Sequence, residues 1–320
     1  MTNPVLQADQ RYVWHPFTQH AWWPDDDPLV ITGGQGVWLQ DSDGQRYIDA
    51  FSSLWVTVHG HNEPRITEAI TAQAQTLDHS TFLGFTHEPG VRLAQELVER
   101  SPASLDRVFF AGDGSSAVEA GIKMAYQAKL QQGQRRPLFV HVAQGYHGDT
   151  LGAVSVGGIE VFHHTYRPIL LSTRMVSSPG VRAPGQSPQD RAAEVLAELR
   201  TLLEEVGPQV CAVVVEPLVQ AAGGMLTHDV SFLQGVRTLS REFGAYLLTD
   251  EVATGIGRTG TMWAVEQAGV EPDLLTCGKG LTGGVLPLSA VLASEEIFDA
   301  FHGDGSQTFF HGHSFTANPL

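Results

Sequence analysis

The stretch PQDRAAEVLAELRTLLEEVGPQVCAVVV, residues 188–215, joins a helix pattern to a strand pattern. Its first part, 188–206, repeats apolar residues at the spacing of one helix face. Its last six residues, VCAVVV, form an unbroken apolar run, which is typical of a strand buried on both faces of a sheet. Strands of this kind occur in parallel sheets that are covered by helices. The stretch therefore predicts one helix–strand unit of an α/β domain.

The same alternation continues on both sides of this stretch. RVFFA (107–111) and PLFVHVA (137–143) are strand patterns, and each is followed by a helix pattern. Downstream, DVSFLQGVRTLSREFG reads as a helix and AYLLTD (245–250) as a strand. From about residue 60 onward the sequence thus predicts an α/β fold with a mostly parallel sheet flanked by helices.

Two segments do not follow the alternation. Residues 1–59 contain VWLQDSDGQRYIDAFSS, which predicts a β-hairpin with Asp43 and Gly44 at its turn, and we expect a peripheral subdomain there. Residues 157–187 are rich in Pro, Gly and Ser, so we predict a loop.

Composition excludes several classes of function. The 320-residue chain has a net charge of −16, which argues against nucleic acid or an anionic membrane as a partner. No apolar run approaches the roughly 20 residues of a membrane-spanning helix. With two cysteines there is no disulfide framework, and a cytoplasmic protein is expected.

A single lysine stands out in LLTCGKGLTGG, a largely apolar segment. The chain has three lysines, and Lys279 lies here between two glycines rather than on a polar helix face. Partial burial lowers the pKa of an amine and makes it usable as a nucleophile and a base. Cys277, two residues earlier, is expected to be a small core residue.

A glycine-rich turn follows the first predicted strand of the α/β region. GDGSSA (112–117) opens a helix, where free backbone N–H groups and the helix dipole favour an anion such as phosphate. The spacing also matches the dinucleotide fingerprint G-x-G-x-x-A, which requires an acidic residue after the next strand. No Asp or Glu lies between Ala120 and Gly148, so dinucleotide binding is disfavoured. A tight turn with a serine cap is the simpler alternative.

Two further side chains lie at predicted strand ends. Tyr146, in GYHGDT, is placed to stack on a planar ligand, although a lone aromatic in a loop is more often only packed. Asp250 ends AYLLTD, the position where α/β sheets bind ligands. A phosphate cradle, a stacking ring, a strand-end carboxylate and a partly buried amine are together what pyridoxal 5′-phosphate (PLP) requires.

The residues also resemble a known family. AGDGSSAVEAGIKMA, GYHGDTLGA, LLTDEVATGIGRTG, PDLLTCGKGLTGG and HGHSFTANPL are similar to motifs of the class III aminotransferases of PLP fold type I, and the resemblance extends from Trp14 to Leu320. It implies that Gly114 and Ser115 bind the PLP phosphate, that Tyr146 stacks on the ring, that Asp250 contacts the ring nitrogen and that Lys279 forms the Schiff base. The catalytic residues are then Lys279, Asp250 and Tyr146.

The resemblance also implies partners. Ser314 stands where the family has a hydroxyl that reaches the PLP of the neighbouring subunit, so a homodimer with the active site at the interface is expected. Trp55, Phe17 and Arg258 match positions that line the substrate pocket. Phe17 replaces a tyrosine of many members, and Leu54 replaces one tryptophan of a pair.

Three segments point to one branch of the family. WHPFTQ, FSSLWVTVHGH and STFLGFTHEPGVRLAQEL resemble the members that transfer an amino group from S-adenosylmethionine to 8-amino-7-oxononanoate in biotin biosynthesis. Another class III activity, of the ω-amino acid:pyruvate type, and a truncated, inactive fragment are the alternatives.

The resemblance further divides the chain. Residues 1–59 are expected to be the N-terminal part of a small subdomain and 60–320 the large PLP-binding domain. The family's pattern continues past the position of Leu320, so we expect a C-terminal subdomain to be absent. The two HGH triplets, at 59–61 and 311–313, lack nearby Cys or carboxylate partners in sequence, and no metal is expected.

Overall fold

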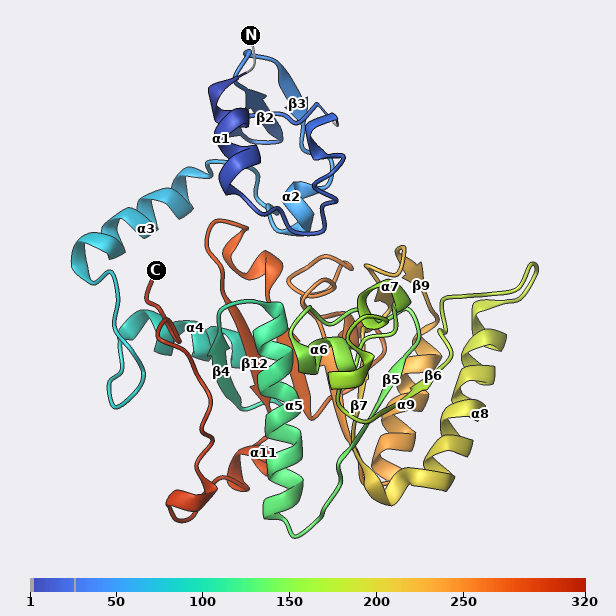
Figure 1. The fold of residues 1–320 in the computed structure, drawn as a ribbon. Helices are drawn as coiled ribbons and strands as arrows, with labels where there is room; N and C mark the ends of the chain where they lie inside the picture. The colour runs from blue at the N-terminus through green and yellow to red at the C-terminus, as the bar shows by residue number, and fades with distance from the viewer. Residues whose placement is uncertain (1–2, 26) are drawn as a thin grey trace. The chain divides into compact units, whose positions relative to one another are not determined.

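The structure, a computed structural model, describes residues 3–25 and 27–320 (Figure 1). They form two compact units, of which the first ends at Ala72 and the second is Gln73–Leu320. The predicted boundary at residue 59 lies within the first unit, before helix α3 (Pro64–Thr76). The two units are described separately.

The first unit contains a small antiparallel sheet in the order β1-β2-β3. The predicted hairpin is confirmed as β2 and β3, with Gly44 at φ +82° in the turn. Asp41 stabilises this turn, since its carboxylate accepts hydrogen bonds from the backbone N–H groups of Asp43 and Gln45 and from the hydroxyl of Tyr47. The elements are α1 (Pro4–Tyr12), η1 (Trp23–Asp25), β1 (Ile31–Gln35), β2 (Trp38–Asp41), β3 (Arg46–Ile48) and α2 (Ser52–Trp55).

The second unit is built on a seven-stranded sheet in the order β4-β12-β11-β10-β7-β5-β6. Only the pairs made by β12 are antiparallel, so the predicted mostly parallel sheet is confirmed. The strands are β4 (Arg107–Ala111), β5 (Leu138–Val142), β6 (Thr173–Val176), β7 (Val210–Val215), β10 (Tyr246–Asp250), β11 (Leu274–Cys277) and β12 (Ser289–Ala293), and a separate pair is β8 (Val219–Gln220) and β9 (Leu226–Thr227).

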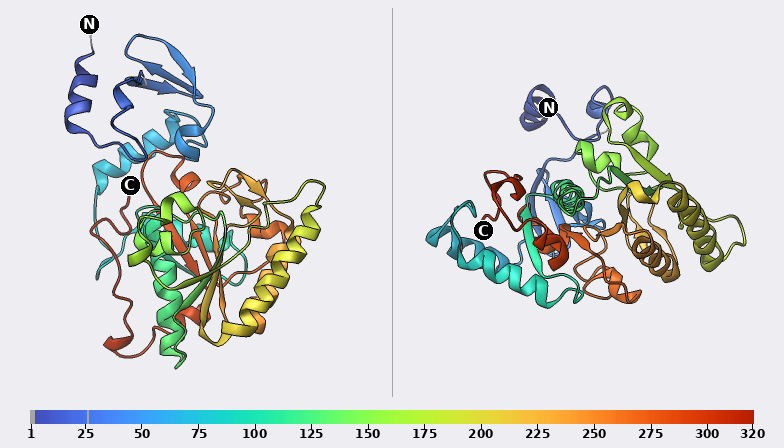
Figure 2. Two further views of the ribbon diagram at one scale, coloured as in Figure 1. Left: turned by 45° about the vertical axis from the view of Figure 1, so that its right-hand side comes forward. Right: turned by 90° about the horizontal axis from the view of Figure 1, so that it is seen from below.

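Helices cover both faces of this sheet (Figure 2). Side chains alternate along each strand, so Leu247 packs into the cluster beneath α8 and α9, whereas Leu248 packs into the cluster beneath α5. The helices are α4 (Glu88–Glu99), α5 (Gly114–Gln131), α6 (Leu151–Ser155), α7 (Glu160–His163), α8 (Pro188–Val206), α9 (Val230–Glu242), α10 (Ala264–Gln267) and α11 (Glu295–Asp299), with 3₁₀ turns η2 (Arg167–Ile169), η3 (Gly207–Gln209), η4 (Lys279–Thr282) and η5 (Gly305–Gln307).

The prediction of a loop over residues 157–187 is wrong in part. The segment contains α7, η2 and the edge strand β6. Arg174 and Met175 of β6 are exposed, because an edge strand carries a neighbour on one side only. Its sequence therefore lacks the apolar run by which the central strands are recognised.

No helix in the described ranges is long and apolar enough to cross a membrane.

Candidate active site

The site lies at the carboxyl edge of the parallel strands. Five strands that are distant in sequence deliver their following residues to this edge: GDGSS after β4, GYHGDT after β5, Glu216 after β7, Asp250 at the end of β10 and Lys279 after β11. Ligands of open α/β sheets bind at such an edge. The topology therefore brings the predicted cofactor-binding motifs of the second unit together.

The first turn of α5 presents free backbone donors. Asp113 is its N-cap, and its carboxylate accepts the N–H of Ser116 at 2.9 Å. The N–H groups of Gly114 and Ser115 have no carbonyl one turn earlier to bond, and no hydrogen bond engages them in the part of the chain described. Gly114 also lies against Val252, whose Cγ1 would stand 2.7 Å from a Cβ at this position, so a larger residue does not fit.

The Ser115 hydroxyl joins α5 to the GYHGDT loop. Its oxygen accepts the N–H of Thr150 at 3.0 Å, and the hydroxyl donates to the Thr150 Oγ1 at 3.1 Å. Gly148, at φ +117°, passes so close that a Cβ there would lie 2.3 Å from Ser115 Oγ. The loop is thus held directly over the first turn of the helix.

Tyr146 is fixed at both ends. Its backbone N–H donates to Glu216 Oε2 at 3.0 Å, and its hydroxyl donates to Asp149 Oδ2 at 2.9 Å. Its ring meets Phe162 edge-on with centroids 5.5 Å apart. Burial, followed by the Asp149 carboxylate, raises the pKa of the Tyr146 hydroxyl, so the side chain is a neutral aromatic surface.

Asp250 is buried and accepts three hydrogen bonds. His147 Nδ1 lies 2.7 Å from Oδ2, while Oδ1 accepts the Val252 N–H at 3.0 Å and the Thr276 hydroxyl at 3.1 Å. Burial acts to lower the pKa of His147, but the hydrogen bond and charge of Asp250, together with the charge of Glu216, raise it above its ordinary value. The contact with Asp250 therefore favours the imidazolium form of His147.

Lys279 begins η4 directly after Gly278 and has φ +35°. Its pKa is lowered, first by burial and also by the charge of Arg258, while the charges of Asp250 and Glu216 oppose the shift. An amine in this environment is neutral in a larger fraction of molecules than a surface lysine.

Glu216 is a further residue of the site, and none of the predicted motifs includes it. It is buried, and its carboxylate accepts the backbone N–H groups of Tyr146 and Ala221, each at 3.0 Å. Burial raises its pKa to about 7. The signal was present, because Glu216 follows the apolar strand VCAVVV just as Asp250 ends AYLLTD.

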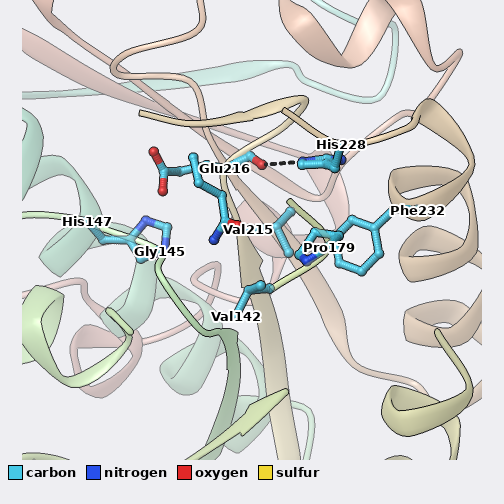
Figure 3. A pocket seen from close by; sticks show the side chains of 9 residues that line it. Val142, Gly145, His147, Pro179, Val215, Glu216, His228 and Phe232 are labelled. Carbon is cyan, nitrogen blue, oxygen red and sulfur yellow. Dashed lines mark hydrogen bonds between the residues drawn. The ribbon is translucent and has the colours of Figure 1, made fainter. Parts of the chain in front are cut away.

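A narrow hollow lies beside Glu216 and His147 (Figure 3). His228 also lines this hollow, and its Nε2 lies 3.2 Å from the Glu216 backbone oxygen. Among the described residues, His147 Nε2 is buried without a hydrogen-bond partner. The lining residues are Val142, Gly145, His147, Pro179, Val215, Glu216, Gln220, His228 and Phe232.

The remaining predicted residues are spread over the chain. Arg258 is an exposed residue between β10 and α10, and its charge acts on Lys279. Ser314 is exposed in the segment that follows η5. Phe17 and Trp55 belong to the first unit, and their proximity to Lys279 stays a prediction.

The HGH triplets are engaged in other contacts. His61 pairs with Asp49 at 2.9 Å, and His311 Nδ1 lies 3.0 Å from the Lys123 amine. Over residues 3–25 and 27–320 no group of three His, Cys, Asp or Glu side chains is arranged to hold a metal ion. Cys277 is fully buried in the core.

The architecture and this convergence of side chains are those of an aminotransferase. The family model of class-III aminotransferases matches residues 22–320, and the chain belongs to this family.

A curated relative and a solved structure carry the same enzyme name. The adenosylmethionine-8-amino-7-oxononanoate aminotransferase of Geobacter sulfurreducens is 45% identical over 325 residues, which cover 100% of this chain and 72% of the relative. The solved structure of the enzyme so named from Methanocaldococcus jannaschii is 38% identical with a TM-score of 0.91, covering 98% of this chain and 71% of that one. An amine transaminase from an uncultivated Pseudomonas species, solved in its PLP-bound form, is 34% identical with a TM-score of 0.90, covering 96% of this chain and 71% of the other.

Proposed function

We propose that this chain transfers the amino group of S-adenosylmethionine to 8-amino-7-oxononanoate and so forms 7,8-diaminononanoate, a step of biotin biosynthesis. The observation that carries the proposal is the 45% identity, over the whole chain, to a curated enzyme named for these substrates. Amine transaminases have the same fold at lower identity, so the fold alone supports the class of reaction and not the substrate pair.

The donor set at the sheet edge fits PLP as the cofactor. We assign the free N–H groups of Gly114 and Ser115 to its phosphate, because a helix N-terminus favours an anion. The Ser115 hydroxyl is engaged with Thr150 and positions the loop, so its contribution to the phosphate is through the backbone. We assign the half-buried ring of Tyr146 to the face of the cofactor ring. When bound, PLP supplies the electrophilic carbon and the electron-withdrawing ring that transamination needs.

Asp250 is the proposed partner of the ring nitrogen. A carboxylate offers about four acceptor positions, and His147, Val252 and Thr276 occupy three of them. One position is therefore left for a protonated ring nitrogen. His147 Nδ1 contacts the Asp250 carboxylate at 2.7 Å and fixes its orientation, and a charged carboxylate here would keep a proton on the ring nitrogen.

Lys279 is the proposed nucleophile and proton carrier. Its lowered pKa leaves Nζ neutral in a larger fraction of molecules, so the amine can attack a carbonyl carbon. Once released, the same Nζ can accept a proton from the substrate carbon and return it to the product. Burial of the amine keeps water from competing for that proton.

Substrate contacts are proposed for Phe17, Trp55 and Arg258. Phe17 is 71% exposed and Arg258 is exposed, so both side chains present surface for a ligand. Arg258 is a cation whose field reaches Lys279, which fits recognition of an anionic or polar group near the reacting amine.

We also propose that the enzyme is a cytoplasmic homodimer. Exposed apolar side chains near Ser314, namely Phe310 at 78% and Phe315 at 67%, support an interface there. Mixing the Lys279→Ala and Ser314→Ala variants tests the arrangement. If Ser314 acts on the partner's cofactor, a mixed dimer contains one site with both defects and one intact site, and it regains activity. Mixtures no more active than the separate variants would contradict a shared site.

The proposed function is tested by incubating the protein with PLP, S-adenosylmethionine and 8-amino-7-oxononanoate and measuring 7,8-diaminononanoate by mass spectrometry. Replacing S-adenosylmethionine with simple amines distinguishes the alternative. Turnover with an amine and pyruvate, and none with S-adenosylmethionine, would identify an ω-transaminase instead.

A further inference from the structure

Helix α2 of the first unit, Ser52–Trp55, is a single left-handed turn. Its four residues have φ values of +55°, +46°, +69° and +67°, and none is glycine. In this region the Cβ of an L-residue lies too close to the following carbonyl oxygen, so consecutive residues of this kind are rare. Such a turn persists only where the surrounding structure holds it, and segments of this kind cluster at functional sites.

The Asp49 carboxylate holds this turn from one side. Its Oδ1 accepts the Ser53 N–H at 2.9 Å, and its Oδ2 accepts the Ser53 hydroxyl at 2.8 Å. The Asp49 side chain is only 2% exposed, and His61 Nε2 contacts Oδ2 at 2.9 Å. Burial acts to raise the pKa of Asp49, but the bonds from Ser53 and His61 more than offset it, and the pKa lies below its ordinary value.

His61 is itself attached to the small sheet. Its backbone exchanges two hydrogen bonds with Gly36, at 3.0 and 2.7 Å. Its ring packs on Gly34, where a Cβ would stand 3.0 Å from His61 Cγ. Gly60, at φ +82°, is pressed so closely on the Gly36 backbone that a Cβ would lie 2.9 Å from the carbonyl oxygen. These contacts explain why Gly60 and His61 stand in this order.

The sheet, His61, Asp49 and the left-handed turn thus form one connected series. We propose that Asp49 and His61 are positioning residues for the substrate, because they fix the turn that carries Trp55. The Trp55 N–H donates to the Phe51 carbonyl at 2.8 Å, so the backbone of this tryptophan is part of the turn. The inference rests on the proposed function, in which the Trp55 side chain contacts the substrate.

The test compares two aspartates of the same unit in the holoenzyme. Asp49→Ala removes the hold on the left-handed turn, whereas Asp41→Ala removes the contacts that stabilise the β2–β3 turn. We expect Asp49→Ala to raise KM for 8-amino-7-oxononanoate about tenfold, the effect of one lost hydrogen bond to a charged group. PLP affinity should stay within about twofold, because the proposed phosphate cradle lies in the second unit. Asp41→Ala should lower the melting temperature and leave KM unchanged.

A second substitution separates positioning from general damage. Glycine adopts the left-handed region without a clash. Adding Ser53→Gly to Asp49→Ala should therefore bring KM most of the way back to the wild-type value. Val56→Gly in the same background is the matched control, because Val56 has φ −105° and gains nothing from glycine. Recovery by both glycines, or by neither, would overturn the inference, as would equal KM changes in the two aspartate variants. If Asp49→Ala does not fold, Asp49→Asn is used, which keeps one acceptor for the Ser53 N–H and loses the charge.

Hydrogen exchange over residues 51–57, measured by mass spectrometry, tests the same inference without turnover. The N–H groups of Trp55, Val56 and Thr57 should exchange faster in Asp49→Ala and at the wild-type rate in Asp41→Ala. Unchanged exchange in Asp49→Ala would refute the role of Asp49. A wild-type protein inactive with S-adenosylmethionine and 8-amino-7-oxononanoate would refute the proposed function alone, and KM would then be compared with the amine that supports turnover.

Discussion

Replacing Asp250 by asparagine changes the hydrogen-bonding pattern at the centre of the site. All three groups around this side chain, His147 Nδ1, the Val252 N–H and the Thr276 hydroxyl, face its oxygens as donors. Two of them share Oδ1, so an asparagine keeps its oxygen there and turns its NH₂ group toward His147. His147 must then accept through Nδ1 and carry its proton on Nε2, which is buried without a partner among the described residues.

The magnitude follows from these contacts. The variant loses one hydrogen bond between charged groups, which contributes about 1.5–3 kcal/mol. It also loses the negative charge that we propose holds a proton on the ring nitrogen. If the bond energy acts fully on the transition state, turnover falls roughly tenfold to a hundredfold, and loss of the ring charge adds to this. The pKa of His147 should fall, because only the charge of Glu216 then opposes the effect of burial.

The assay measures kcat, PLP affinity and the His147 proton resonances in Asp250→Asn. Asp149→Asn is the matched control, since Asp149 is an exposed acidic residue of the same site that contacts the Tyr146 hydroxyl and not the His147 ring. We expect PLP to remain bound in both variants and kcat to fall only in Asp250→Asn. A kcat close to that of the wild type, with an unshifted His147 pKa, would refute the role given to the Asp250 charge.

Three further predictions follow from buried contacts. Lys279→Ala should abolish turnover and the covalent PLP adduct that borohydride traps, because Lys123 contacts His311 and Lys129 lies over the Tyr246 ring. An adduct detected by mass spectrometry in that variant would contradict the assignment. Gly148→Ala should weaken PLP binding and cost about 1–3 kcal/mol of folding stability in denaturant titration, because its Cβ would lie 2.3 Å from Ser115 Oγ, and an unchanged titration would contradict this. Burial raises the pKa of Glu251 to about 7, so its contribution to stability is present below the ordinary pKa of 4.5 and is lost as pH rises through 7. The melting temperature of Glu251→Gln should therefore change less between pH 5 and 8 than that of the wild type, and an equal change would contradict this.

The sequence was sufficient for the central sheet because its strands are buried on both faces. VCAVVV and AYLLTD contain continuous apolar runs, which are not expected in a strand with one exposed face. The structure places them side by side as β7 and β10. The edge strand β6 has one neighbour and exposed side chains, so its pattern does not differ from that of a loop. Local sequence therefore predicts a strand only to the extent that the strand is buried.

The same limit applies to the site. Lys279 and Asp250 could be predicted because each is a charged residue within an apolar segment. Charged side chains are rarely buried unless they have a partner or a function. His147 and Asp250 are 103 residues apart in the chain, and no local pattern encodes their pairing. The left-handed turn at Ser52–Trp55 was also missed, since none of its residues is the glycine that normally marks such a conformation.

The three buried carboxylates at the sheet edge illustrate how position decides charge. Glu216 and Glu251 are both raised to a pKa of about 7, and for each burial is the largest cause and the charge of Asp250 adds to it. Backbone N–H groups provide most of the hydrogen bonds that their carboxylates accept. Asp250 is the one of the three that bonds His147. Near neutral pH the two glutamates therefore carry only part of their negative charge, and Asp250, the carboxylate that bonds His147, is the one proposed to face the ring nitrogen.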